Sequence, residues 1–429
     1  MSDDSKANST KVPEGRVGRL ARLANLGAKT GASMLFRRDA DDAAKKAAEV
    51  LGTLRGLAAK VGQMAGYIDG LVPEEHRGAY ERSMKTLLSA APTSSPEAVR
   101  RKVEEELGAP IDRLFAEWHE APIASASIGQ VHRALLLDGR EVAVKVQHPG
   151  IVEAVESDLK NAGLVQGAIS MLGPRKLESK RVLEEIRTRF REELDYTLEA
   201  ERQATFARLH KGDPTISIPE IVPERTSKGV LTTEFVRGAS LDEAAGAPAA
   251  EREAWCRTLW RFVYKGTVIG GMFNADPHPG NYFFQPGGRV QFIDFGCVQP
   301  IHAKRRDLAR RVHLAAIERN ERAFGMAARE MLETRGGEYE ERVVAYTRRA
   351  FEPQFASPFR ITRAYVVSLV EHMKQAGVET YKAKDDKFVP IPEGMLFMNR
   401  LQFGFFSVLA RLDVEVDYAG VELEFLKPA

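Results

Sequence analysis

The sequence predicts an α+β protein of two lobes, a small β-rich lobe followed by a larger helical lobe, with a helical extension ahead of both. In residues 40–70 apolar side chains recur at spacings of three, four and seven, as on one face of a helix. Residues 122–147 instead alternate apolar and polar residues around a turn signal, which is typical of paired strands. From Glu251 onward helical patterns dominate. We therefore expect an extension over 1–95, a sheet lobe over 96–237 and a helical lobe over 238–429.

The extension contains a basic amphipathic segment, residues 11–38. It carries seven Lys or Arg residues against one Glu, interleaved with leucines. Such a helix could lie on an anionic membrane surface, and the alternative is a solvated helix packed on the body of the protein. No apolar stretch approaches the roughly 18–20 residues needed to span a bilayer, and the first ten residues do not resemble a secretory signal. We expect a cytoplasmic protein that contacts anionic lipids at the inner face of the membrane.

Composition and charge exclude other classes. The formal net charge is only +2, whereas bulk nucleic-acid binding favours a strongly basic domain, so no nucleic-acid partner is expected. Cys256 and Cys297 are the only cysteines, which argues against a disulfide framework and favours a reducing compartment. Neither H-E-x-x-H nor C-x-x-C occurs, so a zinc site is not expected.

The sheet lobe should begin with a helix and continue as strands. The proline-flanked stretch 92–96 supplies a helix start, and Val99, Val103 and Leu107 then fall on one stripe. Asp138-Gly139 is a hairpin signal between two apolar runs.

One strand of this lobe presents a lysine. In residues 141–147 (EVAVKVQ) the period is two, so Lys145 projects from the face opposite the three valines. We expect one continuous helix over 180–209 and a second strand-like pair over 216–236.

Three polar residues, Asp276, Asn281 and Asp294, stand between strand-like runs of the helical lobe. A bound nucleoside triphosphate needs a fixed cation for its phosphates and oxygen ligands for Mg²⁺. Mg²⁺ prefers hard oxygen donors and usually takes one or two from the protein, which Asn281 and Asp294 could supply. Asp276 could orient or deprotonate an attacking hydroxyl. Lys145 could pair with phosphates if a helix carboxylate held it.

The order of these residues is that of the protein-kinase signature set: strand Lys, helix Glu, D-x-x-x-x-N, then D-F-G. Two parts of that set are missing. No G-x-G-x-x-G precedes the Lys145 strand, and no A-P-E follows Asp294. The sequence predicts a bilobal protein-kinase-like fold without the usual peptide-docking activation segment.

With these departures the chain resembles the UbiB/AarF family of atypical kinases, whose members are tied to ubiquinone biosynthesis and other isoprenoid-lipid homeostasis. Four motifs carry the resemblance, which covers roughly residues 11–300. They are K-x-G-Q at 60–63, the alanine-rich loop ASASIGQVH at 124–132, E-x-D at 193–195, and ADPHPGN at 275–281 with its following D-F-G. One position departs from the family, because Asn274 stands where members usually have His. We expect this to alter loop support and to leave the chemistry intact.

The resemblance implies residue roles. The residues expected to bind the nucleotide are Ala124, Ser125, Ala126, Ser127, Ile128, Gly129, Ala143, Lys145, Glu234 and Val236. Glu234 and Val236 would do so through backbone groups of the hinge that joins the two lobes. The catalytic set is Lys145, Glu199 and Asp276, and the metal ligands are Asn281 and Asp294. The cleft would be gated by Lys60, Gln63, Glu193 and Asp195. Asp195 and Glu199, four residues apart, would share the helix face that holds Lys145.

The resemblance implies a Mg²⁺-dependent ATP- or ADP-binding protein with weak ATPase activity. It would support ubiquinone or related lipid biosynthesis, with isoprenoid-lipid intermediates and lipid-biosynthesis enzymes as partners. Two alternatives remain: a small-molecule phosphotransferase of the aminoglycoside or choline kinase type, and a pseudokinase scaffold that binds nucleotide without turnover.

Overall fold

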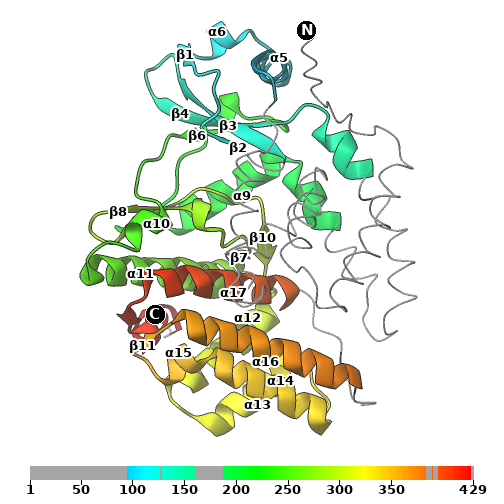
Figure 1. Cartoon of the computed structure of the whole chain (residues 1–429), viewed down its shortest axis with the longest axis vertical. Coiled ribbons are helices and arrows are strands. Elements are labelled where there is room, and N and C mark those ends of the chain that lie inside the picture. The colour runs from blue at the N-terminus through cyan, green and yellow to red at the C-terminus, as the bar shows by residue number, and fades with distance from the viewer. Residues whose placement is uncertain are drawn as a thin grey trace, which may run out of the picture.

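The structure is a computed structural model, and it describes residues 94–125, 128–157, 159, 187–382, 389 and 395–426. A sheet lobe lies at one end of these residues and a helical lobe at the other, as the sequence predicts (Figure 1). The basic segment 11–38, Lys60, Gln63, Ala126 and Ser127 lie outside the described residues. The expected lobe boundaries stay predictions.

The sheet lobe is built on antiparallel strands in the order β1–β3–β4–β6, with β2 also paired to β3. These strands are β1 (Glu117–Trp118), β2 (Ala124–Ser125), β3 (Gly129–Leu135), β4 (Glu141–Gln147) and β6 (Val230–Glu234). The predicted hairpin joins β3 to β4, and its Gly139 has a φ of 87°, which favours glycine. The short helix α6 (Ile111–Leu114) precedes β1.

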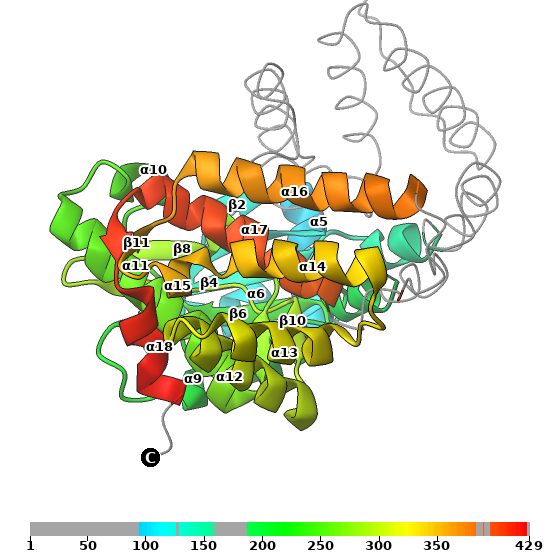
Figure 2. The same ribbon diagram turned by 90° about the horizontal axis from the view of Figure 1, so that it is seen from below.

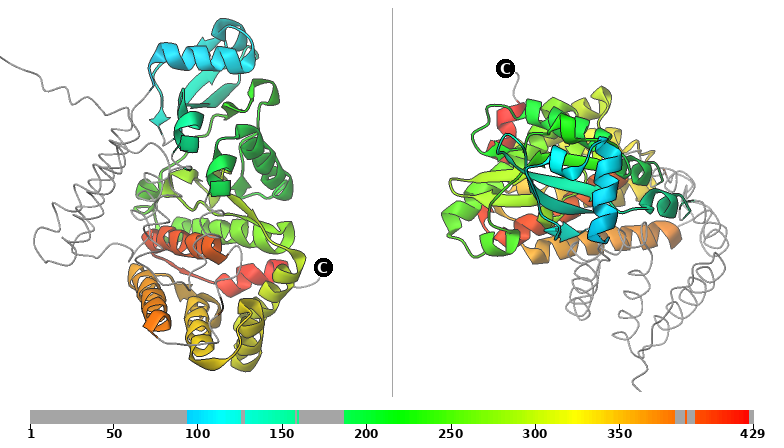
Figure 3. Two further views of the ribbon diagram at one scale, coloured as in Figure 1. Left: turned by 90° about the vertical axis from the view of Figure 1, so that its right-hand side faces the viewer. Right: turned by 90° about the horizontal axis from the view of Figure 1, so that it is seen from above.

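One face of this sheet is covered by α5 (Pro96–Leu107), as Figure 3 shows from above. Val99 and Val103 pack there against the fully buried valines of β4. The Ser95 side chain accepts from the Ala98 N–H and caps the helix, which Pro96 starts. The opposite face of β4, which carries Lys145, is left for the cleft.

The expectation of one continuous helix over 180–209 is wrong within the described residues. Residues 187–193 are helical, the chain then leaves the helix, and α9 (Tyr196–Leu209) begins anew. Asp195 is the N-cap of α9, and its carboxylate accepts from the Thr197 N–H at 3.1 Å. An Asp that bonds the backbone ahead of it favours a cap over a helix interior, so the break has a local cause.

The two strands expected over 216–236 are present, but they lie in different sheets. β6 joins the small sheet, where Ile221 forms an isolated antiparallel bridge to Thr233, whereas β5 (Ile216–Ser217) runs parallel to a strand of the helical lobe. Asp213 anchors β5 there, since its carboxylate accepts from the Thr215 and Ile216 N–H groups and from Arg261 at 2.8 Å. A period of two predicts a strand but does not say which sheet it joins.

The helical lobe surrounds α11, whose Trp255, Leu259, Trp260 and Phe262 are buried. Its helices are α10 (Leu241–Ala244), α11 (Ala249–Tyr264), α12 (Ala303–Ile317), α13 (Glu321–Leu332), α14 (Gly337–Ala350), α15 (Glu352–Phe355), α16 (Arg363–Lys382), α17 (Met395–Leu412) and α18 (Tyr418–Leu426). Its remaining strands are β7 (Met272–Asn274), β8 (Tyr282–Gln285), β9 (Arg289–Phe292), β10 (Val298–Pro300), β11 (Phe359–Arg360) and β12 (Glu415–Val416). Helix α12 packs on α13, α13 on α14, α14 on α16 and α16 on α17 (Figure 2). In the described part of the chain, no helix has the length and apolar character of a membrane span.

A fully buried carboxylate ties the end of the chain to this lobe. Glu422 of α18 accepts from Trp260 Nε1 at 3.0 Å and from Gln354 Nε2 at 2.8 Å. His313 Nδ1 lies 2.7 Å from the other carboxylate oxygen. The buried charge therefore has a partner on each of α11, α12 and α15, as such groups require.

Candidate active site

The centre of the site is the Lys145 ammonium. Its Nζ donates to both carboxylate oxygens of Glu199, each at 2.9 Å, and lies 3.7 Å from Asp294 Oδ2. The Tyr196 ring lies 4.9 Å from the same nitrogen. Burial opposes the charge, but the carboxylates of Glu199 and Asp294 outweigh it and raise the pKa of Lys145 well above its ordinary value. Lys145 is therefore a fixed cation, and Glu199 is the helix carboxylate that the sequence predicts for it.

The hairpin β8–β9 brings Asn281 and Asp294 together. Asn281 precedes β8, Asp294 follows β9, and Tyr282 pairs with Phe292 between them. Asn281 Nδ2 donates to the Asp276 carbonyl at 3.0 Å, which leaves Oδ1 as its atom for a cation. Asp294 Oδ1 accepts from the Gly296 N–H at 3.0 Å. Asp294 thus lies beside the fixed cation, and the hairpin places Asn281 at the same end of its two strands.

Asn274, the departure from the family pattern, connects the two halves of the site. Its side-chain amide donates to the Asp294 carbonyl, and its Oδ1 accepts from the Asp276 N–H at 3.0 Å. The pairing of β7 with β10 holds this residue opposite Val298. Asn274 supports both segments through hydrogen bonds to their backbone. The expectation that it alters loop support relative to His stays a prediction.

The alanine-rich loop starts as a strand. Ala124 and Ser125 form β2, and Ile128 is buried in a cluster that includes Leu194 and Tyr196. Ser125 Oγ is buried with no hydrogen-bond partner among the described residues. A buried hydroxyl of this kind favours an acceptor such as a phosphate oxygen.

Gly129 is required here by packing. A Cβ at this position would lie 2.5 Å from the Val146 carbonyl oxygen and 2.7 Å from Tyr196 Oη. Only a glycine lets β3 come this close to β4 and to the start of α9.

The hinge residues lie at the edge of the cleft. Ala143 is half-buried on the same face of β4 as Lys145, and Val236 is half-buried beyond β6. The Glu234 N–H donates to the Glu220 carbonyl at 2.9 Å, while the Glu234 side chain is exposed. The Glu234 carbonyl accepts from Thr233 Oγ1 at 3.3 Å and keeps a second lone pair that an adenine amine could use.

The E-x-D residues play different parts. Glu193 is buried, with a relative exposure of 7%, whereas Asp195 is occupied in capping α9 through Thr197. The expectation that Asp195 and Glu199 share the helix face that holds Lys145 is therefore wrong. Asp195 precedes the helix, and only Glu199 of the two contacts Lys145.

Sequence reasoning missed a cluster that we call the arginine clasp, Arg189, Glu192 and Arg202. Arg202 donates to the Gly296 carbonyl at 2.9 Å and to Glu192 at 2.6 Å. Arg189 donates to the same Glu192 oxygen at 2.7 Å and to the Val298 carbonyl at 3.2 Å. The segment that follows Asp294 is thereby fixed to α9 and to helix 187–193. Arg189 and Glu192 have helical i,i+3 spacing, but no motif signals the contacts with Gly296 and Val298, which lie 94 and 109 residues from their arginine partners.

Phe295 of the D-F-G motif is fully buried in an aromatic cluster. Its ring centroid lies 5.1 Å from that of Phe206 on α9 and 6.4 Å from that of Phe262 on α11. His210 stacks on Phe262 at 5.1 Å, and both its ring nitrogens are buried without a hydrogen-bond partner in the described chain. Burial, and then the charge of Lys265, lower the pKa of His210 to about 4.

The donor set fits a Mg²⁺–nucleotide better than a metal held by protein alone. In the residues that the structure describes, no group of three or more His, Cys, Asp or Glu side chains is placed to hold a metal. Asp294 and Asn281 supply two oxygen ligands, and Mg²⁺ in nucleotide sites takes its remaining ligands from phosphates and water.

Comparison with known proteins agrees with this geometry. The family model described as the ABC1 atypical kinase-like domain matches residues 86–327. The chain is 30% identical over 319 residues to "Atypical kinase COQ8B, mitochondrial" of Rattus norvegicus, with 69% of this chain and 58% of that protein covered. It is 34% identical over 241 residues to "AarF domain-containing protein kinase 1" of Mus musculus, with 56% and 45% covered. The chain thus spans about half the length of these relatives.

A solved structure of Mycobacterium tuberculosis Rv3197 in complex with erythromycin is similar over almost the whole chain. The TM-score is 0.64 at 26% identity, with 96% of this chain and 100% of that chain covered. The predicted kinase-like fold and the resemblance to the AarF kinases are confirmed. The chain belongs to the ABC1 atypical kinase-like family.

Proposed function

We propose that this protein binds ATP with Mg²⁺ in the cleft around Lys145 and hydrolyses it slowly. The observation that carries the proposal is the placement of Lys145 between Glu199 and Asp294, at 2.9 Å and 3.7 Å. The Lys145 ammonium can pair with phosphate oxygens, and the partly exposed Asp294 carboxylate beside it can bind a divalent cation. A Mg²⁺–nucleotide supplies both of these partners.

Each residue of the cleft has a defined task in this proposal. Lys145 neutralises phosphate charge, and Glu199 holds it in position. Asn281 Oδ1 and the Asp294 carboxylate hold Mg²⁺, which when bound supplies charge stabilisation at the phosphates. Asp276 orients water or an acceptor hydroxyl, with its loop fixed by Asn274. The hinge backbone at Glu234 and Val236 binds the adenine beside Ala143.

We further propose that the activity supports ubiquinone or related isoprenoid-lipid metabolism at the inner face of a membrane. Family membership and the basic amphipathic character of residues 11–38 support this context. The gating of the cleft by Lys60 and Gln63, together with Glu193 and Asp195, belongs to the same proposal, as does contact with lipid-biosynthesis enzymes.

The test is phosphate release from ATP, measured with Mg²⁺ and with anionic vesicles present or absent. We expect slow release that needs Mg²⁺ and falls at least a hundredfold in Asp276→Asn, because general acid–base help contributes about 10²–10⁴-fold. Asp112→Asn, at an exposed carboxylate of α6, is the control and should match the wild type. Nucleotide binding without any release would point to a pseudokinase scaffold. Stoichiometric transfer to a soluble acceptor without lipid would point to a small-molecule phosphotransferase.

A further inference from the structure

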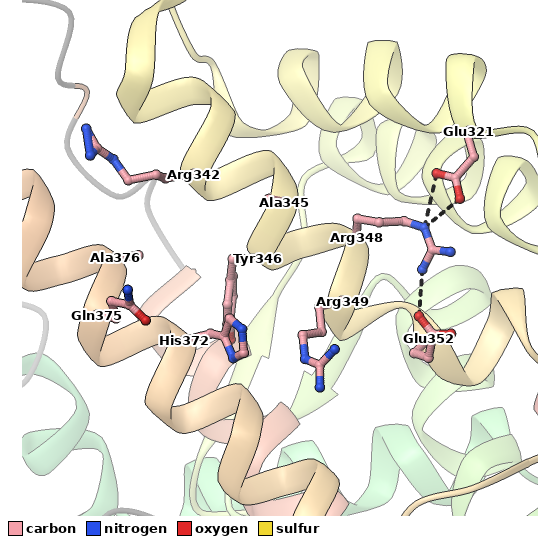
Figure 4. Close-up of a pocket in the computed structure, with 10 residues that line it drawn as sticks. All are labelled: Glu321, Arg342, Ala345, Tyr346, Arg348, Arg349, Glu352, His372, Gln375 and Ala376. Carbon is pink, nitrogen blue, oxygen red and sulfur yellow. Dashed lines mark hydrogen bonds and ion pairs between the residues drawn. The ribbon is translucent and has the colours of Figure 1, made fainter.

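A groove of about 620 Å³ lies between α14 and α16 of the helical lobe (Figure 4). Figure 1 shows these two helices at the end of the protein away from the sheet lobe. Arg342, Tyr346 and Arg349 line it from α14, where spacings of four and three place them on one face. His372 and Gln375 line it from α16. Two facing helices thus present mainly hydrogen-bond donors to the space between them.

The charged groups around the groove are largely paired: Arg342 donates to Glu338 at 3.0 Å, and the two lining carboxylates, Glu321 and Glu352, both pair with Arg348. Arg348 Nε lies 2.9 Å and 3.0 Å from the two carboxylate oxygens of Glu321, and its Nη1 lies 2.8 Å from Glu352 (Figure 4). The same guanidinium lies over the Phe355 ring at 3.5 Å. Arg348 therefore pairs with Glu321 and Glu352 at one end of the groove.

One of the lining side chains has a hydroxyl without a hydrogen-bond partner among the described residues. Tyr346 Oη is buried and has no hydrogen-bond partner in the described part of the chain. Burial raises the pKa of this phenol, so Tyr346 is a neutral donor. A buried polar group left unpaired costs stability, so an occupant that accepts from it is favoured.

Two further groups beside Tyr346 can contact an occupant of the groove. Arg349 is exposed, and its guanidinium donates to the neutral Ser368 hydroxyl at 3.2 Å, a contact that does not compensate its charge. His372 Nδ1 lies 2.6 Å from the Ser368 carbonyl, which fixes a proton on Nδ1. Nε2 is therefore the ring nitrogen left to accept a hydrogen bond.

We propose that this groove binds a phosphate monoester, independently of the nucleotide cleft. Terminal oxygens of such a group can accept from the Tyr346 hydroxyl and the Arg349 guanidinium, and a protonated phosphate oxygen can donate to His372 Nε2. A carboxylate has only two oxygens, and a metal cation is disfavoured by the arginines. The group could come from a free metabolite or from a lipid headgroup, since both present the same chemistry.

The test uses glycerol phosphate as the soluble probe and thermal unfolding as the measurement. We expect it to raise the melting temperature of the wild type. Tyr346→Phe and Arg349→Gln should raise the dissociation constant about tenfold or more, because each loses a hydrogen bond that involves a charged group. Arg322→Gln, at an exposed arginine of α13, should behave as the wild type. Without the probe, Tyr346→Phe should be at least as stable as the wild type, because no hydrogen bond is lost.

A second arm separates the two sources by flotation with phosphatidylcholine vesicles, with and without phosphatidic acid. Binding that needs phosphatidic acid and is lost in Tyr346→Phe and Arg349→Gln identifies a lipid headgroup. Saturable binding of glycerol phosphate alone, lost in the same variants, identifies a free phosphate monoester. Equal melting shifts in the wild type and both variants, or no shift in any of them, would overturn the proposal.

Discussion

The arginine clasp can be tested by replacing Arg202 with Met. The guanidinium of Arg202 donates to the Gly296 carbonyl and to Glu192, and its side chain is only 15% exposed. Met keeps the apolar stem and removes both donors. Glu192 retains Arg189, so the variant leaves no unpaired carboxylate.

The size of the effect follows from these contacts. Each hydrogen bond to a charged group contributes about 1.5–3 kcal/mol, so the loss of two should lower the free energy of unfolding by about 3–6 kcal/mol. Gly296 also donates its N–H to Asp294 Oδ1, so a loosened Gly296 weakens the metal ligand. If the free energy of Mg²⁺ binding becomes weaker by about 1 kcal/mol as a result, the Mg²⁺ dissociation constant rises about fivefold.

The assay is a titration of Mg²⁺ at fixed nucleotide, followed by the melting temperature. Arg208→Met is the matched control, since Arg208 lies on the same helix and its guanidinium donates to Thr205 of that helix. We expect weaker Mg²⁺ binding in Arg202→Met and an unchanged value in the control. Equal Mg²⁺ dissociation constants in all three proteins would refute the positioning role, whatever their stability.

Three further substitutions test the fold around the site. Because the folded-state pKa of His210 is about 4, below the unfolded value near 6.5, the folded state binds fewer protons and stability falls as pH drops from about 6.5 to 4. His210→Phe should remove up to about 3 kcal/mol of that fall, measured by urea unfolding at pH 7.5 and 4.5; an unchanged difference would contradict the assignment. Gly129→Ala should cost about 1–3 kcal/mol by forcing β3 from β4, and a wild-type melting temperature would show that the strands separate freely. Glu422→Ala should cost about 3–5 kcal/mol, because Trp260, Gln354 and His313 lose their acceptor; a cost below 1 kcal/mol in denaturant unfolding would rule out that role.

Much of the site could be predicted because its parts are local patterns. The period of two placed Lys145 on the cleft face, and motif order selected Glu199 from many acidic residues. The hairpin β8–β9 then brings Asn281 and Asp294 together with no long-range packing to predict.

Other parts required the folded chain. The helix break at Asp195 depends on how its carboxylate is used. It can cap the start of a new helix or lie on the face of a continuous one, and the sequence allows both. The sheet that β5 joins is decided by the contact of Asp213 with Arg261, 48 residues later. The arginine clasp and the groove beside Tyr346 likewise depend on contacts between separate elements, which helical spacing alone does not predict.

The central claim is that Asp294 and Lys145 share one bound Mg²⁺–nucleotide. The most direct measurement is the stabilisation of the protein by Mg²⁺–ADP, compared between the wild type and Asp294→Asn. At about 100 times the dissociation constant, the wild type should gain about 2.7 kcal/mol in the free energy of unfolding. Asp294→Asn should lose most of this gain while its melting temperature without ligand stays nearly unchanged, since an amide oxygen can still accept from the Gly296 N–H. A full gain in the variant would contradict the claim.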